Sequence, residues 1–144
     1  MSNVKRPLRV IQWATGAIGK FNIVTCSRNP AFELVGCWVF SPGKAGRDAG
    51  EIAGIGPIGV RTTNSIEEIL ALDADIVQYA PLLANVDEIC RLLESGKNVI
   101  TPSGFTNETW LLDRDMYNMI YQPLNDHNCP FASDGYLILS FGHK

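Results

Sequence analysis

The sequence lacks the features that mark several large classes of protein. No apolar run approaches the ~20 residues that cross a bilayer, and the apolar pair Val10-Ile11 is followed at once by Gln12, so no signal-peptide core is present. We therefore expect a cytoplasmic protein with no membrane partner. Lysines and arginines number 12 against 15 aspartates and glutamates, a net charge of -3. This balance offers no electrostatic basis for binding nucleic acid.

Metal-ligand patterns are missing as well. The four cysteines are widely spaced, without a C-x-x-C pair or a histidine cluster beside them (Cys26, Cys37, Cys90 and Cys129). We expect reduced, mostly buried thiols and no metal site. His127 and His143 lie in polar surroundings and are expected to face solvent. No Ser/His/Asp or Cys/His catalytic set emerges from the sequence.

Apolar runs of strand length alternate with stretches of helical periodicity, which is typical of a parallel sheet with crossover helices. We predict a doubly wound, Rossmann-type α/β domain with three αβα layers over residues 1–144. The five predicted strands are Leu8 to Trp13, Leu34 to Phe40, Val60 to Thr63, Asp75 to Ala80 and Asn98 to Thr101.

Helices are predicted between these strands. The first contains Ile18, Phe21, Val24 and Thr25 at helical spacing and ends before Pro30. The next two begin with caps at Ser65 and Asn85, and Gly96 ends the second of them. A fourth helical pattern covers Trp110 to Tyr121.

Two strand-like segments follow Pro130, at Phe131 to Ser133 and Tyr136 to Phe141. Only one of them fits easily as a sixth parallel strand. The segment from Tyr136 is hydrophobic, and an exposed strand of this kind pairs readily with another chain, so we expect a homodimer.

The segment from Val10 to Lys20 reads VIQWATGAIGK and lies between the first strand and the first helix. Gly16 would let the backbone approach a pyrophosphate, and Gly19 would let the helix pack closely on the strand. Amides free at the helix start would then face the anion. Ala14 occupies the place of the first glycine in G-x-G-x-x-G, so the match is partial, and any tight strand-to-helix turn could use such a pair. The predicted contacts are Trp13, Ala14, Thr15, Gly16, Ala17, Ile18 and Gly19; for Trp13 the alternative is a place in the core.

The residues after the second strand indicate which dinucleotide would bind. Domains selective for NAD usually place a carboxylate at this point, but here no acid occurs before Asp48. The hydroxyl of Ser41 and the cations of Lys44 and Arg47 suit a 2′-phosphate. NADP is therefore favoured over NAD, with use of both left open; a solvated basic turn is the alternative.

Several of these motifs together resemble one protein family. The run from Arg9 to Gly19, the stretch from Phe32 to Gly36 with Ser41 to Glu51, and the stretch from Gly96 to Thr101 are similar to the dihydrodipicolinate-reductase-like proteins. That group includes the 2,4-diaminopentanoate dehydrogenases and their amine dehydrogenase relatives. The resemblance covers roughly residues 8 to 120.

The resemblance implies a two-domain enzyme that transfers a hydride between a nicotinamide cofactor and a C=N or amine carbon of a small substrate. Residues at the carboxyl ends of the fourth and fifth strands would line the nicotinamide crevice: Ala80, Pro81, Thr101, Pro102, Ser103 and Gly104. From Ser133 onward the sequence departs from the family pattern, so we expect the family's substrate domain to have no counterpart here. A binding or sensing module for NAD(P)(H) without turnover is therefore a second hypothesis.

The proton that accompanies hydride transfer to an imine needs a donor. Glu108 lies just past the fifth strand and is the catalytic candidate, although an acid at a helix start is the more common role for such a residue. Asp134 follows the last strand-like residues and fits an ordinary turn. The sequence thus indicates the cofactor site more clearly than the chemistry.

Overall fold

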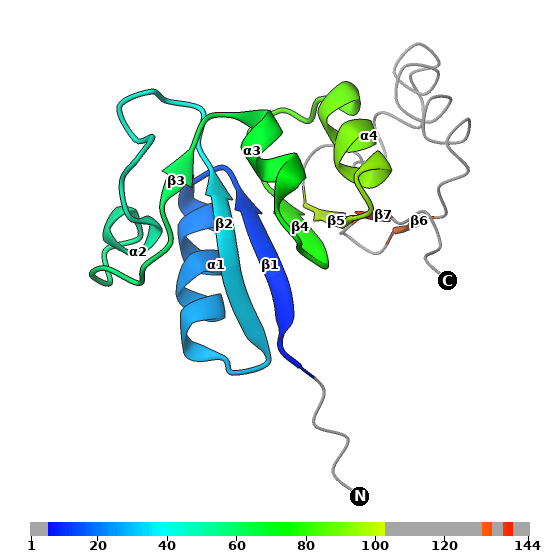
Figure 1. The fold of residues 1–144 in the computed structure, drawn as a ribbon. Helices are drawn as coiled ribbons and strands as arrows, with labels where there is room; N and C mark the ends of the chain where they lie inside the picture. The colour runs from blue at the N-terminus through cyan, green and yellow to red at the C-terminus, as the bar shows by residue number, and fades with distance from the viewer. Residues whose placement is uncertain (1–5, 103–130, 134–136, 140–144) are drawn as a thin grey trace, which may run out of the picture.

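The computed structural model describes residues 6–102, 131–133 and 137–139. Five strands run parallel in one sheet (Figure 1): β1 (Leu8–Trp13), β2 (Phe32–Trp38), β3 (Thr62–Thr63), β4 (Ile76–Tyr79) and β5 (Asn98–Thr101). Two short strands, β6 (Phe131–Ser133) and β7 (Leu137–Leu139), extend the sheet. The strand order is β3-β2-β1-β4-β5-β7-β6. The chain thus moves outward from β1 to β3 and then returns to the other side of β1, as in a doubly wound sheet.

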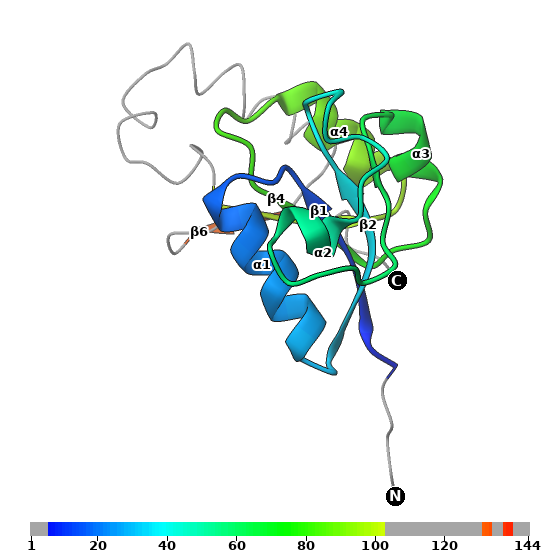
Figure 2. The ribbon, with the colours of Figure 1, turned by 90° about the vertical axis from the view of Figure 1, so that its left-hand side faces the viewer.

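Helices cover both faces of the sheet, as predicted. α1 (Ala17–Arg28) and α2 (Ala49–Ile52) lie on one side of the strands, and α3 (Ile66–Ala71) and α4 (Val86–Glu94) lie on the other (Figure 2). Alternate side chains of β1 lie on opposite faces of the sheet. Those of Ile11 and Trp13 are part of the core under α3 and α4. A separate core under α1 and α2 contains Ile23, Cys37, Val39 and Ala49. The predicted αβα layering is confirmed.

Local signals in the sequence set several helix boundaries. Ser65 Oγ accepts a hydrogen bond from the backbone N–H of Glu68 (3.3 Å), and Asn85 Oδ1 accepts one from Glu88 (3.2 Å), so both predicted caps are confirmed. Gly96 follows α4 with φ of +93°, a conformation that glycine adopts without strain. No helix in the described ranges is long and apolar enough to cross a membrane.

α1 turns a different face to the sheet than its apolar spacing suggests. Its buried residues are Gly19, Ile23 and Cys26, whereas Ile18 and Phe21 are exposed. Gly19, which closely approaches the loop before the helix, therefore lies on the face of α1 that packs against the sheet.

Both C-terminal segments form strands, but neither is a parallel neighbour of β5. β7 pairs antiparallel with β5, and β6 pairs antiparallel with β7. Only residues 134–136 separate β6 from β7, and so short a connection permits an antiparallel pair but not a parallel one. Because β7 has a strand on each side, it is not the free edge on which the dimer prediction rested. The dimer stays a prediction without that support.

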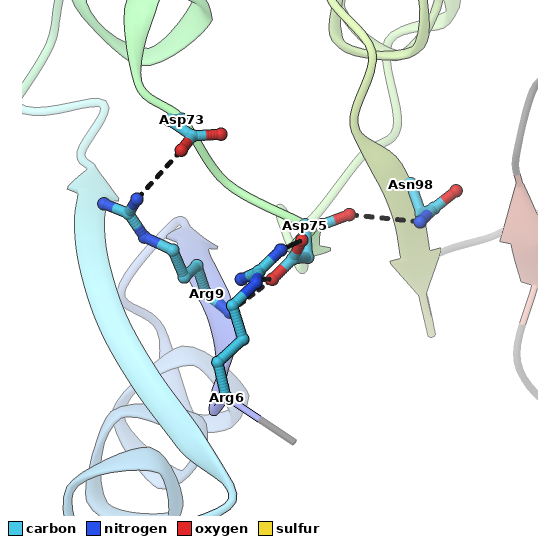
Figure 3. Close-up of polar contacts among 5 residues, drawn as sticks. All are labelled: Arg6, Arg9, Asp73, Asp75 and Asn98. Carbon is cyan, nitrogen blue, oxygen red and sulfur yellow. Dashed lines mark hydrogen bonds and ion pairs between the residues drawn. The ribbon is translucent and has the colours of Figure 1, made fainter. Parts of the chain in front are cut away.

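Charged and polar side chains tie the amino ends of three strands together (Figure 3). The Asp75 carboxylate accepts hydrogen bonds from both Nη atoms of Arg6 and from the backbone N–H of Arg9, each at 2.8 Å. The Asp75 carbonyl accepts one from Asn98 Nδ2 (3.1 Å), and Arg9 Nη1 bonds to Asp73 (3.0 Å). The hydrogen bonds from Arg6 are the main cause that lowers the pKa of Asp75. This edge of the sheet is therefore held by pairs within the chain.

The described cysteines are buried, as predicted: Cys26, Cys37 and Cys90. Burial raises the pKa of Cys26 to about 11 and that of Cys37 to about 12. Neither thiol is therefore a ready nucleophile at neutral pH. Cys129 lies outside the described residues.

Candidate functional site

The loop after β1 lies at the point where the strand order reverses. The backbone N–H of Ala14 donates to the carbonyl of Trp38 (2.9 Å), and the N–H of Ala80 donates to the carbonyl of Trp13 (3.1 Å). The loop is thus attached to the ends of β2 and β4, its two neighbours in the sheet. Ligands of doubly wound sheets bind in the crevice at this position.

Ala14 adopts the conformation that the missing glycine would have. Its φ is +78°, and it is the only non-glycine residue with a positive φ in the described part of the chain. An alanine is held there at a cost of about 1 kcal/mol. The loop therefore follows the dinucleotide fingerprint in its backbone, although its sequence matches only partly.

The two glycines of the loop answer different needs. A Cβ on Gly19 would lie only 2.1 Å from the carbonyl oxygen of Ala14, so no side chain fits between the helix and the loop. A Cβ on Gly16 would meet no atom of the described residues within 4 Å, and Gly16 has an ordinary φ of -71°. The close packing predicted for Gly19 is confirmed. The space beside Gly16 is open.

The amino end of α1 carries unpaired backbone donors. Gly16 caps the helix without a side-chain hydrogen bond, and the first turn has no acidic residue. The N–H of Lys20 donates to the carbonyl of Gly16 (2.9 Å), which leaves the amides of Ala17, Ile18 and Gly19 without a partner inside the helix. Their partial positive charge, added to the helix dipole, favours an anion beside Gly16.

Lys44 reaches back to this loop from the segment after β2. Its Nζ donates to Thr15 Oγ1 at 3.2 Å. Thr15 is buried and Lys44 is half-buried. Among the described residues Lys44 forms no ion pair with a carboxylate. A partly desolvated cation therefore stands next to the amino end of α1 with only a hydroxyl as its acceptor.

The basic segment after β2 begins with a tight turn. The Lys44 N–H donates to the carbonyl of Ser41 (3.0 Å), and Ser41 Oγ accepts from the N–H of Gly43 (3.3 Å). Arg47 is exposed and forms no ion pair within the described residues. Ser41 and Lys44 are thus brought together, while Arg47 lies one turn further along.

Two residues that the sequence analysis passed over fix this segment. Asp48 accepts hydrogen bonds from four backbone N–H groups, those of Gly50, Glu51, Ile58 and Gly59, at 2.7 to 3.3 Å. Burial acts to raise the pKa of Asp48, but these four bonds outweigh it and lower the pKa. Thr62 Oγ1 lies 2.6 Å from the carbonyl of Lys44 and 3.0 Å from that of Arg47. In the sequence, an aspartate between the basic turn and a glycine-rich stretch could have indicated a side chain that binds backbone amides of this segment.

Gln12 is a third residue that sequence reasoning missed. It is fully buried in the middle of β1, and its Nε2 donates to the carbonyls of Ala14 (3.0 Å) and Trp13 (3.2 Å). Its amide therefore supports the loop from beneath. A polar residue in an otherwise apolar strand just before a glycine turn was the signal, since buried polar groups need partners.

Trp13 belongs to the core. It is fully buried and stacks on Trp38 with ring centroids 4.3 Å apart and an angle of 11° between the planes. Tyr79 packs beside it, and the Tyr79 hydroxyl donates to Glu88 Oε2 at 2.6 Å. Burial is the main cause that raises the pKa of Tyr79, and Glu88 adds to it. The core alternative for Trp13 fits this position.

The predicted nicotinamide side of the site is described only in part. Ala80 and Pro81 follow β4, and Thr101 ends β5. A groove of about 400 Å³ runs from the start of α1 to this edge and is lined by Ala17, Ile18, Phe21, Asn22, Gln78, Ile100 and Pro102. The catalytic candidate Glu108 and the residues Ser103, Gly104, His127, Asp134 and His143 lie outside the described residues. Within the described ranges no three His, Cys, Asp or Glu side chains gather in a way that could hold a metal.

Similar proteins of known activity share this part of the fold. The chain is 35% identical over 103 residues to an amine dehydrogenase of Streptomyces virginiae, and 29% identical over 106 residues to a 4-hydroxy-tetrahydrodipicolinate reductase of Synechococcus elongatus. It is a homologue of these two enzymes. The matches cover 67% and 69% of the chain, but only 28% and 39% of the relatives' lengths. The chain thus spans well under half of either relative's length, and no family model matches it.

Solved structures agree with this homology. The amine dehydrogenase of Mycobacterium smegmatis superposes with a TM-score of 0.62 at 25% identity, over 72% of this chain and 31% of that one. Two more distant structures share the fold: GenD2 from gentamicin A biosynthesis in complex with NAD (TM-score 0.57, 19% identity, 85% and 34% covered) and biliverdin reductase from Synechocystis in complex with biliverdin and NADP+ (0.53, 18%, 81% and 35%). The resemblance seen in the sequence is confirmed, and these neighbours bind NAD or NADP.

Proposed function

We propose that this chain binds NADP or NAD, with the pyrophosphate beside Gly16. One observation carries the proposal: the amides at the start of α1 have no partner inside the helix, the Lys44 ammonium lies beside them on Thr15 Oγ1, and no described atom lies within 4 Å of a Cβ placed on Gly16. Positive charge that no carboxylate of the described chain neutralises favours an anion there. The loop after β1 would hold the cofactor from Ala14 to Gly19.

NADP is the expected preference. Ser41 and Lys44 lie in the same turn, and Arg47 follows with a free guanidinium. A 2′-phosphate would find a hydroxyl and two cations there, and no carboxylate lies between the end of β2 and Asp48 to hold a bare ribose. Four backbone amides donate to the Asp48 carboxylate, so its oxygens are not available to accept hydrogen bonds from the ribose hydroxyls of NAD.

The reaction we propose is hydride transfer between the nicotinamide and a C=N or amine carbon of a small substrate. The support for this step is homology to an amine dehydrogenase and a reductase, together with a site that fits a dinucleotide. When bound, the nicotinamide ring would supply or accept the hydride. Ala80, Pro81 and Thr101 would border that ring, and the proton donor stays unassigned apart from the prediction of Glu108.

A titration tests the cofactor proposal. Wild-type chain is titrated with NADPH and NADH by calorimetry, beside Lys44→Gln, Arg47→Gln and the control Lys20→Gln, whose side chain is exposed on α1. We expect binding of both coenzymes, tighter for NADPH. Lys44→Gln should weaken coenzyme binding about tenfold, since it removes a charge-assisted hydrogen bond. Arg47→Gln should reduce the ratio of NADPH affinity to NADH affinity.

Absence of binding by the wild type would refute the proposal. If Lys44→Gln and Lys20→Gln lose the same amount of coenzyme affinity, the loss reflects only the change in net charge and not a contact made by Lys44. Tight coenzyme binding with no imine reduction or amine oxidation would instead favour a binding module without turnover.

A further inference from the structure

One tyrosine hydroxyl joins the end of β4 to the start of α4. The Tyr79 hydroxyl donates to Glu88 Oε2 (2.6 Å) and accepts a hydrogen bond from the backbone N–H of Asn85 (2.9 Å). Asn85 is the N-cap of α4, and its Oδ1 accepts from the N–H of Glu88 (3.2 Å). In an ordinary capping box the acid three residues after the N-cap binds the N-cap amide directly. Here the hydroxyl of Tyr79 bonds to both partners, so the cap of α4 depends on the end of β4.

The same tyrosine contacts the residue that precedes the loop after β1. Its ring is fully buried and packs against Trp13, with ring centroids 5.7 Å apart. The N–H of Ala80, the next residue along the chain, donates to the carbonyl of Trp13 (3.1 Å). Residues 80–84 are therefore held at both ends, at Ala80 by the end of β1 and at Asn85 by the Tyr79 hydroxyl.

The residues between these two ends have little burial to fix them. Leu82 and Leu83 are 96% and 81% exposed, and none of residues 80–84 is fully buried. A segment with few buried contacts depends on its attached ends for its conformation. A loop that is already fixed also binds its ligand more tightly, because less conformational freedom is lost on binding.

We propose that Tyr79 is a positioning residue for the cofactor, whose hydroxyl fixes residues 80–84 so that Ala80 and Pro81 border the nicotinamide ring. This inference rests on the proposed function. Tyr79 acts through the loop and not by touching the ligand, since its side chain is fully buried. Removal of the hydroxyl would release the Asn85 amide from its acceptor, while the ring would keep its packing against Trp13.

Calorimetric titration of NADPH into wild type, Tyr79→Phe, Glu88→Ala and Glu88→Gln tests this role. Tyr79→Phe should weaken NADPH binding about fivefold, with a less favourable binding entropy, because the loop is then ordered only on binding. Glu88→Ala should weaken binding in the same way, and it keeps the test available if Tyr79→Phe does not fold. Glu88→Gln keeps an acceptor for the phenol and should retain the wild-type affinity. In the free protein, the Asn85 amide hydrogen should exchange with solvent faster in Tyr79→Phe than in wild type.

Ser65→Ala is the matched control. Its Oγ caps α3 by accepting from the N–H of Glu68, so this variant also loses a helix cap, but α3 follows β3 and not β4. Its NADPH affinity should equal that of wild type. If Ser65→Ala loses as much affinity as Tyr79→Phe, or if Tyr79→Phe binds NADPH as tightly as wild type, the positioning role is refuted while the proposed function stands. If wild type does not bind NADPH, the proposed function fails and this inference fails with it.

Discussion

Gly16 and Gly19 lie three residues apart in one loop, yet the protein needs them for different reasons. Gly19 is required by packing, because a Cβ there would collide with the carbonyl of Ala14. Gly16 is required by nothing within the described protein, since the space beside it is open and its φ suits any residue. Because the described fold does not restrict this position, we propose that the glycine serves a ligand that binds beside the amides at the start of α1.

Gly19→Ala should destabilise the fold. The added methyl must push apart α1 and the loop after β1, at a cost of about 1–3 kcal/mol of unfolding free energy. Urea denaturation followed by tryptophan fluorescence measures this directly. Gly43→Ala is the control, because a Cβ there makes only an ordinary 3.6 Å contact with Ser41 Oγ. Equal stability of the two variants would contradict the packing role of Gly19.

At the scale of elements, one aspartate connects the amino ends of β1, β4 and β5. The Asp75 carboxylate binds Arg6 and the backbone of Arg9, and its carbonyl binds Asn98 (Figure 3). Because the folded pKa of Asp75 is lowered, the ionised form is favoured in the folded state. Its contribution to stability is therefore complete above the unfolded pKa of about 3.9 and disappears as the pH falls through the lower folded value.

Asp75→Asn should lower the free energy of unfolding by about 1 kcal/mol at neutral pH. The difference from wild type should be constant between about pH 5 and 8, and should shrink below about pH 4. Urea denaturation at a series of pH values provides the measurement. Asp73→Asn, at a carboxylate that is 93% exposed and makes one ion pair with Arg9, should change stability by less than about 0.5 kcal/mol. If the difference in unfolding free energy between wild type and Asp75→Asn is as large at pH 3 as at neutral pH, the role assigned to Asp75 is wrong.

Elements set by local signals could be predicted from the sequence, and those set by tertiary contacts could not. The bounds of β1 and β5 match the prediction, because their apolar runs are clearly delimited. β2 begins at Phe32 and ends at Trp38, two residues earlier at each end than predicted. The four-residue helix α2 was missed, since it has no periodicity and depends on the cap at Asp48. The direction of β7 was missed as well, because it depends on pairing and not on composition.

The candidate site follows the same division. The glycine loop could be located from the sequence, because its spacing expresses backbone geometry directly. The contact between Lys44 and Thr15 spans 29 residues, and the supports from Gln12, Asp48 and Thr62 depend on how loops meet in space. Pattern reasoning therefore located the loop that we propose as the anion site, but not the residues that hold this loop in place.

At the scale of the whole molecule, the two edges of the sheet differ in kind. The amino edge is closed by ion pairs within the chain. The carboxyl edge presents amides without a partner inside α1, a lysine that forms no ion pair with a described residue, and exposed apolar side chains. Figure 1 shows the ends of β1 and β2 at the top of the molecule, away from the N-terminus. This polarity predicts where a ligand binds.

Addition of NADPH to 15N-labelled chain should shift the backbone amide signals of the carboxyl edge. The affected residues are expected in the ranges 14–19, 40–47 and 80–83. The amide signals of residues at the amino edge, such as Arg9, Asp75 and Asn98, should not shift, because these residues lie at the other end of the strands. Shifts spread evenly over both edges would indicate nonspecific binding.

The most direct test of the central claim is a paired measurement on wild type and Gly16→Ala, in which NADPH affinity and unfolding free energy are determined for both. The claim is that the space beside Gly16 belongs to a phosphate and not to the protein. We predict that the methyl group lowers the affinity at least tenfold while the free energy of unfolding stays the same or rises by up to about 1 kcal/mol, as for a glycine replaced at an unstrained position. Unchanged NADPH affinity in Gly16→Ala would contradict the account.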